Sequence, residues 1–215
     1  MLAENISGIK QEIGQNVQLV VVSKYRDISE IKAAYDTGHR VFAENRVQAL
    51  LERVDALPKD IQWHLIGHLQ TNKVKYIAPF IACIQSVDSL HLLSEINKQA
   101  QKNNRVIDCL LQIYIASEDT KFGLSEEECL ALLDSDEFKG MKNIRIRGLM
   151  GMASNTDDEQ QVEREFKQLN SFFERLKKEK MSEDFNVLSM GMSGDYALAI
   201  RCGSNMIRVG SKVFE

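Results

Sequence analysis

The sequence has few cysteines and no cysteine pairs of the kind that bind zinc or exchange disulfides. Its four cysteines, Cys83, Cys109, Cys129 and Cys202, stand far apart, and no C-x-x-C motif occurs. Isolated cysteines in apolar segments are typically reduced residues of a hydrophobic core. We therefore predict neither a zinc site nor a redox role for them.

An excess of positive charge, a long apolar run and a recognisable secretory leader are also missing. Lysine and arginine total 27 against 31 aspartate and glutamate residues, for a net charge of -4. A general nucleic-acid-binding protein would carry a basic field instead. The N-terminal residues show no basic segment followed by an apolar core, and no apolar run is long enough to span a membrane. We expect a cytoplasmic protein that binds neither nucleic acid nor membranes.

Proline is scarce, and no linker rich in proline, glycine or serine divides the chain. Pro58 and Pro79 are the only prolines, and each lies near the end of a helical pattern. Hydrophobic residues make up 44% of the 215 residues, which is enough for a sizeable core. We predict a single domain over residues 1–215.

Eight apolar segments predict strands, and helical patterns alternate with them. The predicted strands are 17–24, 40–44, 62–67, 83–87, 106–115, 145–152, 187–190 and 206–209. The predicted helices are 1–14, 28–37, 46–57, 72–77, 90–102, 126–134, 158–180 and 196–202, with none after the last strand. This alternation implies a parallel sheet, and eight units in just over 200 residues match a closed (β/α)8 TIM barrel. A doubly wound open sheet is the alternative, although no G-x-G-x-x-G motif follows the first strand.

Lys24 stands at the C-terminal end of the first predicted strand, after the apolar run from Leu19 to Val22. Parallel α/β folds build their active sites at this end of the strands. A lysine that is buried or flanked by cations loses its proton more readily and can form a Schiff base with a carbonyl compound. A solvated lysine at a strand end is the plainer alternative, so the other strand ends must decide between the two.

Two turns that contain glycine and serine follow the last two predicted strands. Gly191 to Asp195 precedes a short helix, and Gly210 with Ser211 follows the final strand. Glycine lets the backbone approach a ligand closely, and a helix N-terminus offers N–H groups to an anion. Each turn alone could be an ordinary tight turn, with Ser193 as an N-cap. Together they predict a phosphate site, because barrels often bind phosphate after strands seven and eight.

Other polar residues fall at the same predicted end of the strands. Arg208 either forms a structural ion pair or faces a ring nitrogen or an anion in the mouth of the barrel. His64 and His68 lie on either side of Gly67, which does not give helical metal-ligand spacing, so we predict hydrogen-bonding wall residues and no metal site. Lys121 is either a second amine near the ligand or a surface lysine.

A Schiff-base lysine combined with a phosphate site suggests pyridoxal 5′-phosphate (PLP). At this point the sequence resembles, over nearly its whole length, the YggS/PROSC family of pyridoxal phosphate homeostasis proteins. The most specific matching segments are residues 63–73 (WHLIGHLQTNK) and 189–193 (SMGMS), and the others are 21–24, 44–48, 147–150 and 207–211.

The resemblance implies an alanine-racemase-like barrel, equivalent to the racemase N-terminal domain without its second domain. The cofactor-binding residues that it implies are Lys24, Asn45, Met192, Ser193, Arg208, Gly210 and Ser211. Lys24 would hold PLP as a Schiff base, Asn45 would lie near the ring and Arg208 would face the pyridine nitrogen. Ser193, Gly210 and Ser211 would bind the phosphate. The implied role is intracellular PLP homeostasis without established catalytic turnover, in a monomer whose candidate partners are apo PLP-dependent enzymes.

Two other functions remain open at this stage, a PLP-dependent amino-acid racemase and a lysine aldolase that acts on a phosphorylated substrate. PLP enzymes of the strong electron-sink type place a carboxylate at the pyridine nitrogen, and an arginine there disfavours the protonated ring. Racemisation also needs a second base, and the sequence offers no residue that can be named for this role. We therefore expect a PLP-binding protein, with the racemase-like enzyme as the alternative.

Overall fold

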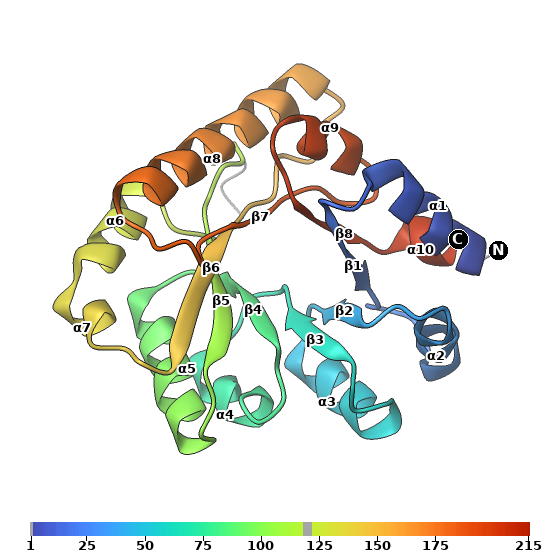
Figure 1. Cartoon of the computed structure of the whole chain (residues 1–215), viewed down its shortest axis with the longest axis horizontal. Helices are drawn as coiled ribbons and strands as arrows, with labels where there is room; N and C mark the ends of the chain where they lie inside the picture. The colour runs from blue at the N-terminus through green and yellow to red at the C-terminus, as the bar shows by residue number, and fades with distance from the viewer. Residues whose placement is uncertain (1, 118–121) are drawn as a thin grey trace.

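The computed structural model describes residues 2–117 and 122–215. Within them, parallel strands close into one barrel in the order β1 to β8, and helices surround the barrel (Figure 1). The strands are β1 (Gln18–Val22), β2 (Val41–Glu44), β3 (Gln62–Leu65), β4 (Cys83–Val87), β5 (Ile107–Gln112), β6 (Ile144–Met150), β7 (Val187–Ser189) and β8 (Met206–Val209). The predicted closed barrel is confirmed, and the open sheet is excluded.

The helices follow the predicted alternation, with two additions. They are α1 (Leu2–Ile13), α2 (Ile28–Asp36), α3 (Val47–Ala56), η1 (Thr71–Lys73), α4 (Val74–Ile77), α5 (Leu90–Lys102), α6 (Glu126–Asp134), α7 (Asp136–Lys139), α8 (Glu159–Glu179), α9 (Tyr196–Arg201) and α10 (Ser211–Phe214). The predicted helix 72–77 is formed by η1 followed directly by α4. The short helices α7 and α10 were not predicted, and α10 corrects the expectation that no helix follows the last strand. In Figure 1, α10 lies beside α1, so the two ends of the chain meet where β1 pairs with β8.

Strand β5 is shorter than the sequence predicts. The apolar pattern continues to Ile115, but the strand ends at Gln112. The backbone N–H of Tyr114 donates to the carbonyl of Leu124, and the N–H of Leu124 donates to the carbonyl of Gln112. The chain therefore leaves the barrel wall to pair with the segment that precedes α6, and β6 is longer than β5.

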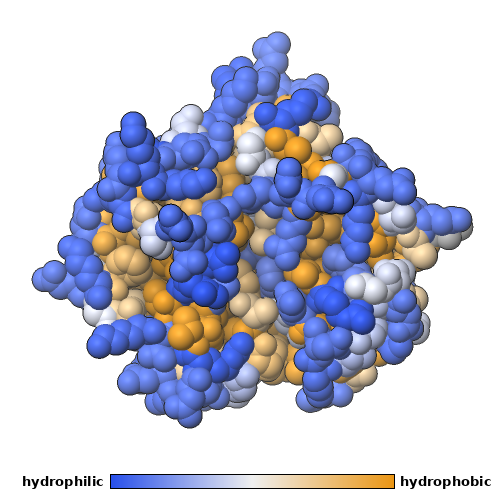
Figure 2. All heavy atoms as spheres, in the orientation of Figure 1, coloured by the Kyte–Doolittle hydropathy of each residue, from blue (hydrophilic) through white to orange (hydrophobic). Residues whose placement is uncertain are grey.

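The alternation of side chains along the strands creates two separate apolar layers. Outward residues such as Leu19 and Val21 pack against the helices in the main core, whereas Val20 and Val22 lie in a second cluster inside the barrel. The other buried members of that inner cluster are Ala43, Cys83, Leu110, Met150 and Met206. On the face shown in Figure 2, polar side chains cover much of the surface and apolar ones are visible between them.

All four cysteines are buried and unpaired, as predicted. Burial raises the pKa of the Cys129 thiol to about 12, so this thiol stays protonated at neutral pH. Among the described residues, no helix is both long enough and apolar enough to cross a bilayer.

Candidate functional site

A cavity of about 540 Å³ opens at the C-terminal ends of the strands. Its size falls within the range of roughly 300–1,000 Å³ that small-molecule sites occupy. All seven residues predicted to contact a cofactor line it: Lys24, Asn45, Met192, Ser193, Arg208, Gly210 and Ser211. The loops after β1, β2, β7 and β8 thus place these residues around one space.

Lys24 lies in a turn two residues beyond the end of β1 and is exposed to solvent, so it does not end the strand as predicted. The turn is tight, because the N–H of Arg26 donates to the carbonyl of Ser23 over 3.1 Å. The residue between them, Tyr25, has a positive φ of 66°, a conformation that a bulky side chain seldom adopts. The amine is therefore accessible from the mouth of the cavity, and its backbone is held in an uncommon conformation.

A buried ion pair supports this turn from outside the barrel. Glu44 at the end of β2 accepts a hydrogen bond of 2.6 Å from the Ser23 hydroxyl, and its Oε1 lies 2.7 Å from Nε of Arg53 on α3. The Arg53 guanidinium also donates to the carbonyl of Arg26 over 2.8 Å. Both ends of the segment that carries Lys24 are thus tied to one charge pair. The sequence analysis did not identify Arg53, whose only signal is a charge on the inner face of an amphipathic helix.

The two predicted phosphate turns face the same cavity and contact each other. The N–H of Gly210 donates to the hydroxyl of Ser193 over 3.2 Å, which joins the turn after β7 to the turn after β8. The backbone N–H groups of Ser193, Gly194 and Ser211 donate to no acceptor among the described residues. Gly191 has a φ of 99°, and a Cβ there would lie 2.7 Å from the Cβ of Ala199, so only glycine fits. This arrangement offers several N–H and O–H donors to an anion.

Arg208 enters the cavity from inside the barrel. Its side chain is almost fully buried, and its guanidinium donates to the Ser189 hydroxyl over 2.7 Å and to the carbonyl of Gly151 over 3.0 Å. Burial lowers the pKa of Arg208 to about 10, which still leaves it charged at neutral pH. Of the two predicted roles, the structural ion pair is not seen among the described residues, so the positive charge remains available to a ligand.

Asn45 follows β2 and lines the cavity at a point where Gly67 permits a close approach of two loops. A Cβ on Gly67 would come within 2.1 Å of the carbonyl oxygen of Asn45. The Ser86 hydroxyl fixes the same loop by donating to the Gly67 carbonyl over 2.6 Å. Ser86 thus supports this loop and does not itself line the cavity.

The two histidines do not line the cavity, contrary to the prediction of wall residues. His64 is buried inside the barrel, where its Nδ1 lies 2.8 Å from the Gln85 amide nitrogen. His68 pairs with Asp88 over 3.0 Å and stacks on Phe122, with 4.2 Å between the ring centroids. Both form hydrogen bonds as predicted, but with residues outside the cavity.

Several further residues line the cavity. They include Met152, Ile66 and Glu215. Lys121, considered as a second amine, lies outside the described residues.

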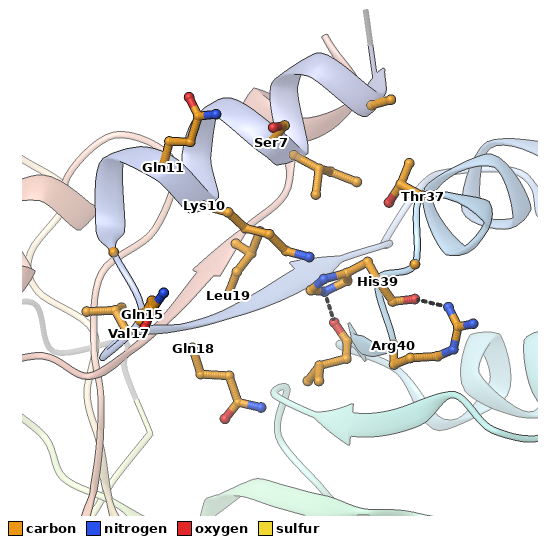
Figure 3. Close-up of a pocket in the computed structure, with 15 residues that line it drawn as sticks. Ser7, Lys10, Gln11, Gln15, Val17, Gln18, Leu19, Thr37, His39 and Arg40 are labelled. Carbon is orange, nitrogen blue, oxygen red and sulfur yellow. Dashed lines mark hydrogen bonds between the residues drawn. The ribbon is translucent and has the colours of Figure 1, made fainter.

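A larger hollow of about 770 Å³ lies at the opposite end of the barrel, between α1 and the starts of β1 and β2 (Figure 3). Its polar side chains mainly hold the fold together. His39 Nε2 donates to the carbonyl of Val41 over 2.8 Å, and Arg40 pairs with Asp60 over 2.8 Å. Burial lowers the pKa of His39 to about 4, so its ring is neutral at physiological pH. We therefore place the functional site at the smaller cavity, where an accessible amine and unpaired anion donors meet.

Comparison with known proteins identifies the same kind of barrel. The family model of the alanine racemase N-terminal domain matches residues 1–214. A pyridoxal phosphate homeostasis protein of Pasteurella multocida is 34% identical over 226 residues, covering 99% of this chain and 96% of its own. A protein of that name from Synechocystis is 37% identical over 204 residues, covering 93% and 91%.

Solved structures agree with these relatives. PipY from Synechococcus elongatus, solved with PLP bound, is 32% identical with a TM-score of 0.90, and both chains are covered completely. An alanine racemase from Clostridium difficile has a TM-score of 0.77 at 14% identity, covering 99% of this chain and 55% of its own, which shows a shared fold. The chain therefore belongs to the alanine racemase N-terminal domain family and, within it, to the pyridoxal phosphate homeostasis proteins.

Proposed function

We propose that this protein binds PLP in the cavity at the C-terminal end of the barrel and serves intracellular PLP homeostasis. Lys24 holds the cofactor as a Schiff base. Ser193, Gly194, Gly210 and Ser211 bind its phosphate, and Arg208 faces its ring. The observation that carries this proposal is the meeting, in one cavity, of an accessible lysine and two joined turns with free N–H donors.

The chemistry of the donor set fits PLP at both ends of the cofactor. Uncapped N–H groups and serine hydroxyls are typical ligands of a phosphate dianion. The Arg208 cation can donate to a ring nitrogen but cannot accept from it, so it favours an unprotonated ring. Bound PLP supplies an electron sink, which this arginine makes weaker than a carboxylate partner would. The residues of this chain thus fit the holding of PLP better than strong carbanion chemistry.

The absorption spectrum of the purified, PLP-loaded protein tests the proposal. We expect a visible absorption band, attachment of the cofactor to Lys24 after borohydride reduction, and loss of both in Lys24→Ala. Lys73→Ala is the matched control, because Lys73 is an exposed lysine near the same face that does not line the cavity. A colourless protein, or reduction onto another lysine with Lys24 intact, would contradict the proposed site.

A racemase-like activity is the functional alternative, and it has a separate test. Rapid exchange of the alanine α-hydrogen with deuterated solvent that is lost in Lys24→Ala but kept in Lys73→Ala would show catalysis. The homeostasis proposal would then give way to a racemase-like enzyme. We expect no such exchange above the rate of free PLP.

We also propose that the protein acts in the cytoplasm as a monomer that delivers PLP to apo PLP-dependent enzymes. The open mouth of the cavity and the exposed position of Lys24 support release to a partner. Mixing the loaded protein with an apo PLP enzyme should transfer PLP faster than dissociation into buffer allows. If transfer to the apo enzyme were no faster than dissociation into buffer, direct transfer would be contradicted. Light scattering tests the monomer, and a mass of twice the chain's would contradict it.

A further inference from the structure

A chain of hydrogen-bonded polar side chains crosses the interior of the barrel and ends at the cavity. Arg208 on β8 donates to the Ser189 hydroxyl on β7, and this hydroxyl donates to Gln85 Oε1 on β4 over 2.7 Å. The Gln85 amide nitrogen then meets His64 Nδ1 on β3 at 2.8 Å. All four side chains are at least nine-tenths buried. They share the inward-facing register of Val187, Met206, Cys83 and Ile66.

The hydrogen bonds of this relay, defined as His64, Gln85, Ser189 and Arg208, run in one direction. An amide nitrogen can only donate, so His64 Nδ1 must be the acceptor and its ring must be neutral. Burial lowers the pKa of His64 to about 4, which agrees with a neutral ring. If the Gln85 amide were flipped, its nitrogen and the Arg208 guanidinium would both donate to the Ser189 hydroxyl oxygen. The hydroxyl hydrogen would then lose its present acceptor, Gln85 Oε1. Each dipole therefore points its negative end toward Arg208.

The relay contains no carboxylate. Among residues 2–117 and 122–215, Arg208 forms no ion pair, and Asp195 is the charged group that acts on it from a distance. Asp195 itself accepts a hydrogen bond of 2.6 Å from the N–H of Met192. A buried cation usually requires a paired anion or equivalent hydrogen bonding. Here the oriented dipoles of Ser189, Gln85 and His64 take the place of an anion. They carry no net charge, so the positive charge of Arg208 is not cancelled.

We propose that His64, Gln85 and Ser189 are positioning residues that fix the Arg208 guanidinium and keep its charge uncompensated toward the ligand. This inference rests on the proposed function, in which the ligand is PLP. An uncompensated cation at the ring keeps the ring nitrogen as an unprotonated acceptor. A carboxylate in place of the Gln85 amide would reverse this influence while occupying nearly the same volume.

The substitution Gln85→Glu in the full chain tests the electrostatic part of the proposal. Titration of the visible band of the PLP-loaded protein should give a pH midpoint about one unit higher than in the wild type, because a nearby negative charge favours bound protons. Other charged groups are common to both proteins. Lys24, Arg26 and Glu215 line the cavity, and Glu44 interacts with Lys24. Asp195 acts on Arg208, and Asp108 acts on His64. Leu110→Met is the matched control, since Leu110 lies in the same inner layer without joining the relay. An unchanged midpoint in Gln85→Glu would overturn the proposal.

The pair Ser189→Ala and Ser189→Thr tests positioning without a change of charge. Loss of the hydroxyl in Ser189→Ala should weaken PLP binding about tenfold, and Ser189→Thr, which keeps the hydroxyl, should restore most of the affinity. These two Ser189 variants also keep the proposal testable if Gln85→Glu does not fold. Equal affinities for all three proteins would contradict a positioning role.

A measurement on the apoprotein separates failure of the relay from failure of PLP binding. Nitrogen-15 NMR should show His64 as the neutral tautomer protonated at Nε2, with Nδ1 as the hydrogen-bond acceptor, and Gln85→Leu should alter the Nδ1 signal. A ring protonated at Nδ1 would overturn the relay whether or not PLP binds. A wild-type protein without a visible band would refute the PLP proposal and leave this NMR result standing.

Discussion

At the scale of the residue, Ser193 joins the two halves of the anion site. Its hydroxyl oxygen accepts from the N–H of Gly210 and can still donate its hydrogen into the cavity. Gly210 lies close to the first strand, because a Cβ there would be in tight contact, at 3.1 Å, with the carbonyl oxygen of Val22. Removing the hydroxyl would therefore affect the ligand and the spacing of the two turns together.

We expect Ser193→Ala to weaken PLP binding by roughly 10- to 100-fold, since a hydrogen bond to a charged group contributes about 1.5–3 kcal/mol. Ser193→Thr keeps the hydroxyl and should remain within about threefold of the wild type. Fluorescence titration of PLP measures both, and pyridoxal without its phosphate is the control ligand. If pyridoxal lost as much affinity as PLP, the serine would not be a phosphate ligand.

At the scale of the element, β2 and α3 together hold the turn that carries Lys24. Glu44 is fully buried, and its Oε2 has no hydrogen-bond partner among the described residues. Burial raises the pKa of Glu44, while the Ser23 hydroxyl and the Arg53 cation act in the opposite direction. A buried pair of this kind adds little net stability when intact, but the loss of one partner is costly because it leaves an unpaired charge.

Arg53→Met should destabilise the protein by about 3–5 kcal/mol near pH 8. Without the cation, the pKa of Glu44 in the folded state rises further above its unfolded value. In the window between the two values only the folded state binds the proton, so stability falls as the pH rises. The loss of stability should therefore be smaller at pH 5. The part of the loss that remains there comes from the hydrogen bonds that Arg53 makes to the carbonyls of Ala49 and Arg26. Urea unfolding at both pH values measures it.

Arg175→Met is the control for this prediction. Arg175 forms a surface ion pair with Glu126 at 2.8 Å, and its side chain is 45% exposed. Its replacement should cost at most about 1 kcal/mol at either pH. A loss in Arg53→Met that did not change with pH would show that Glu44 stays ionised and that the carbonyl contacts dominate.

At the scale of the whole molecule, the sequence predicted what local periodicity determines and missed what depends on distant partners. The alternation of apolar segments was sufficient for the closed barrel and for placing Lys24 and Ser193 at the C-terminal face of the barrel. It could not show where β5 ends, because Ile113 and Ile115 are apolar and buried after the chain has left the barrel. In strands buried on both faces, the sequence pattern does not show which residues point into the barrel. The hydrogen bond between Gln85 and Ser189, 104 positions apart, therefore had no sequence signal.

Residues from both ends of the chain line one cavity, so PLP binding should stabilise the whole barrel. A ligand that binds only the folded state adds about 2.7 kcal/mol at a concentration 100 times its Kd. For a protein of this size we expect Tm to rise by roughly 5–10 °C. Lys24→Ala should show a much smaller rise at the same concentration, whereas Lys73→Ala should match the wild type. Differential scanning fluorimetry measures all three, and an equal rise in Lys24→Ala would show that the covalent bond contributes nothing to binding.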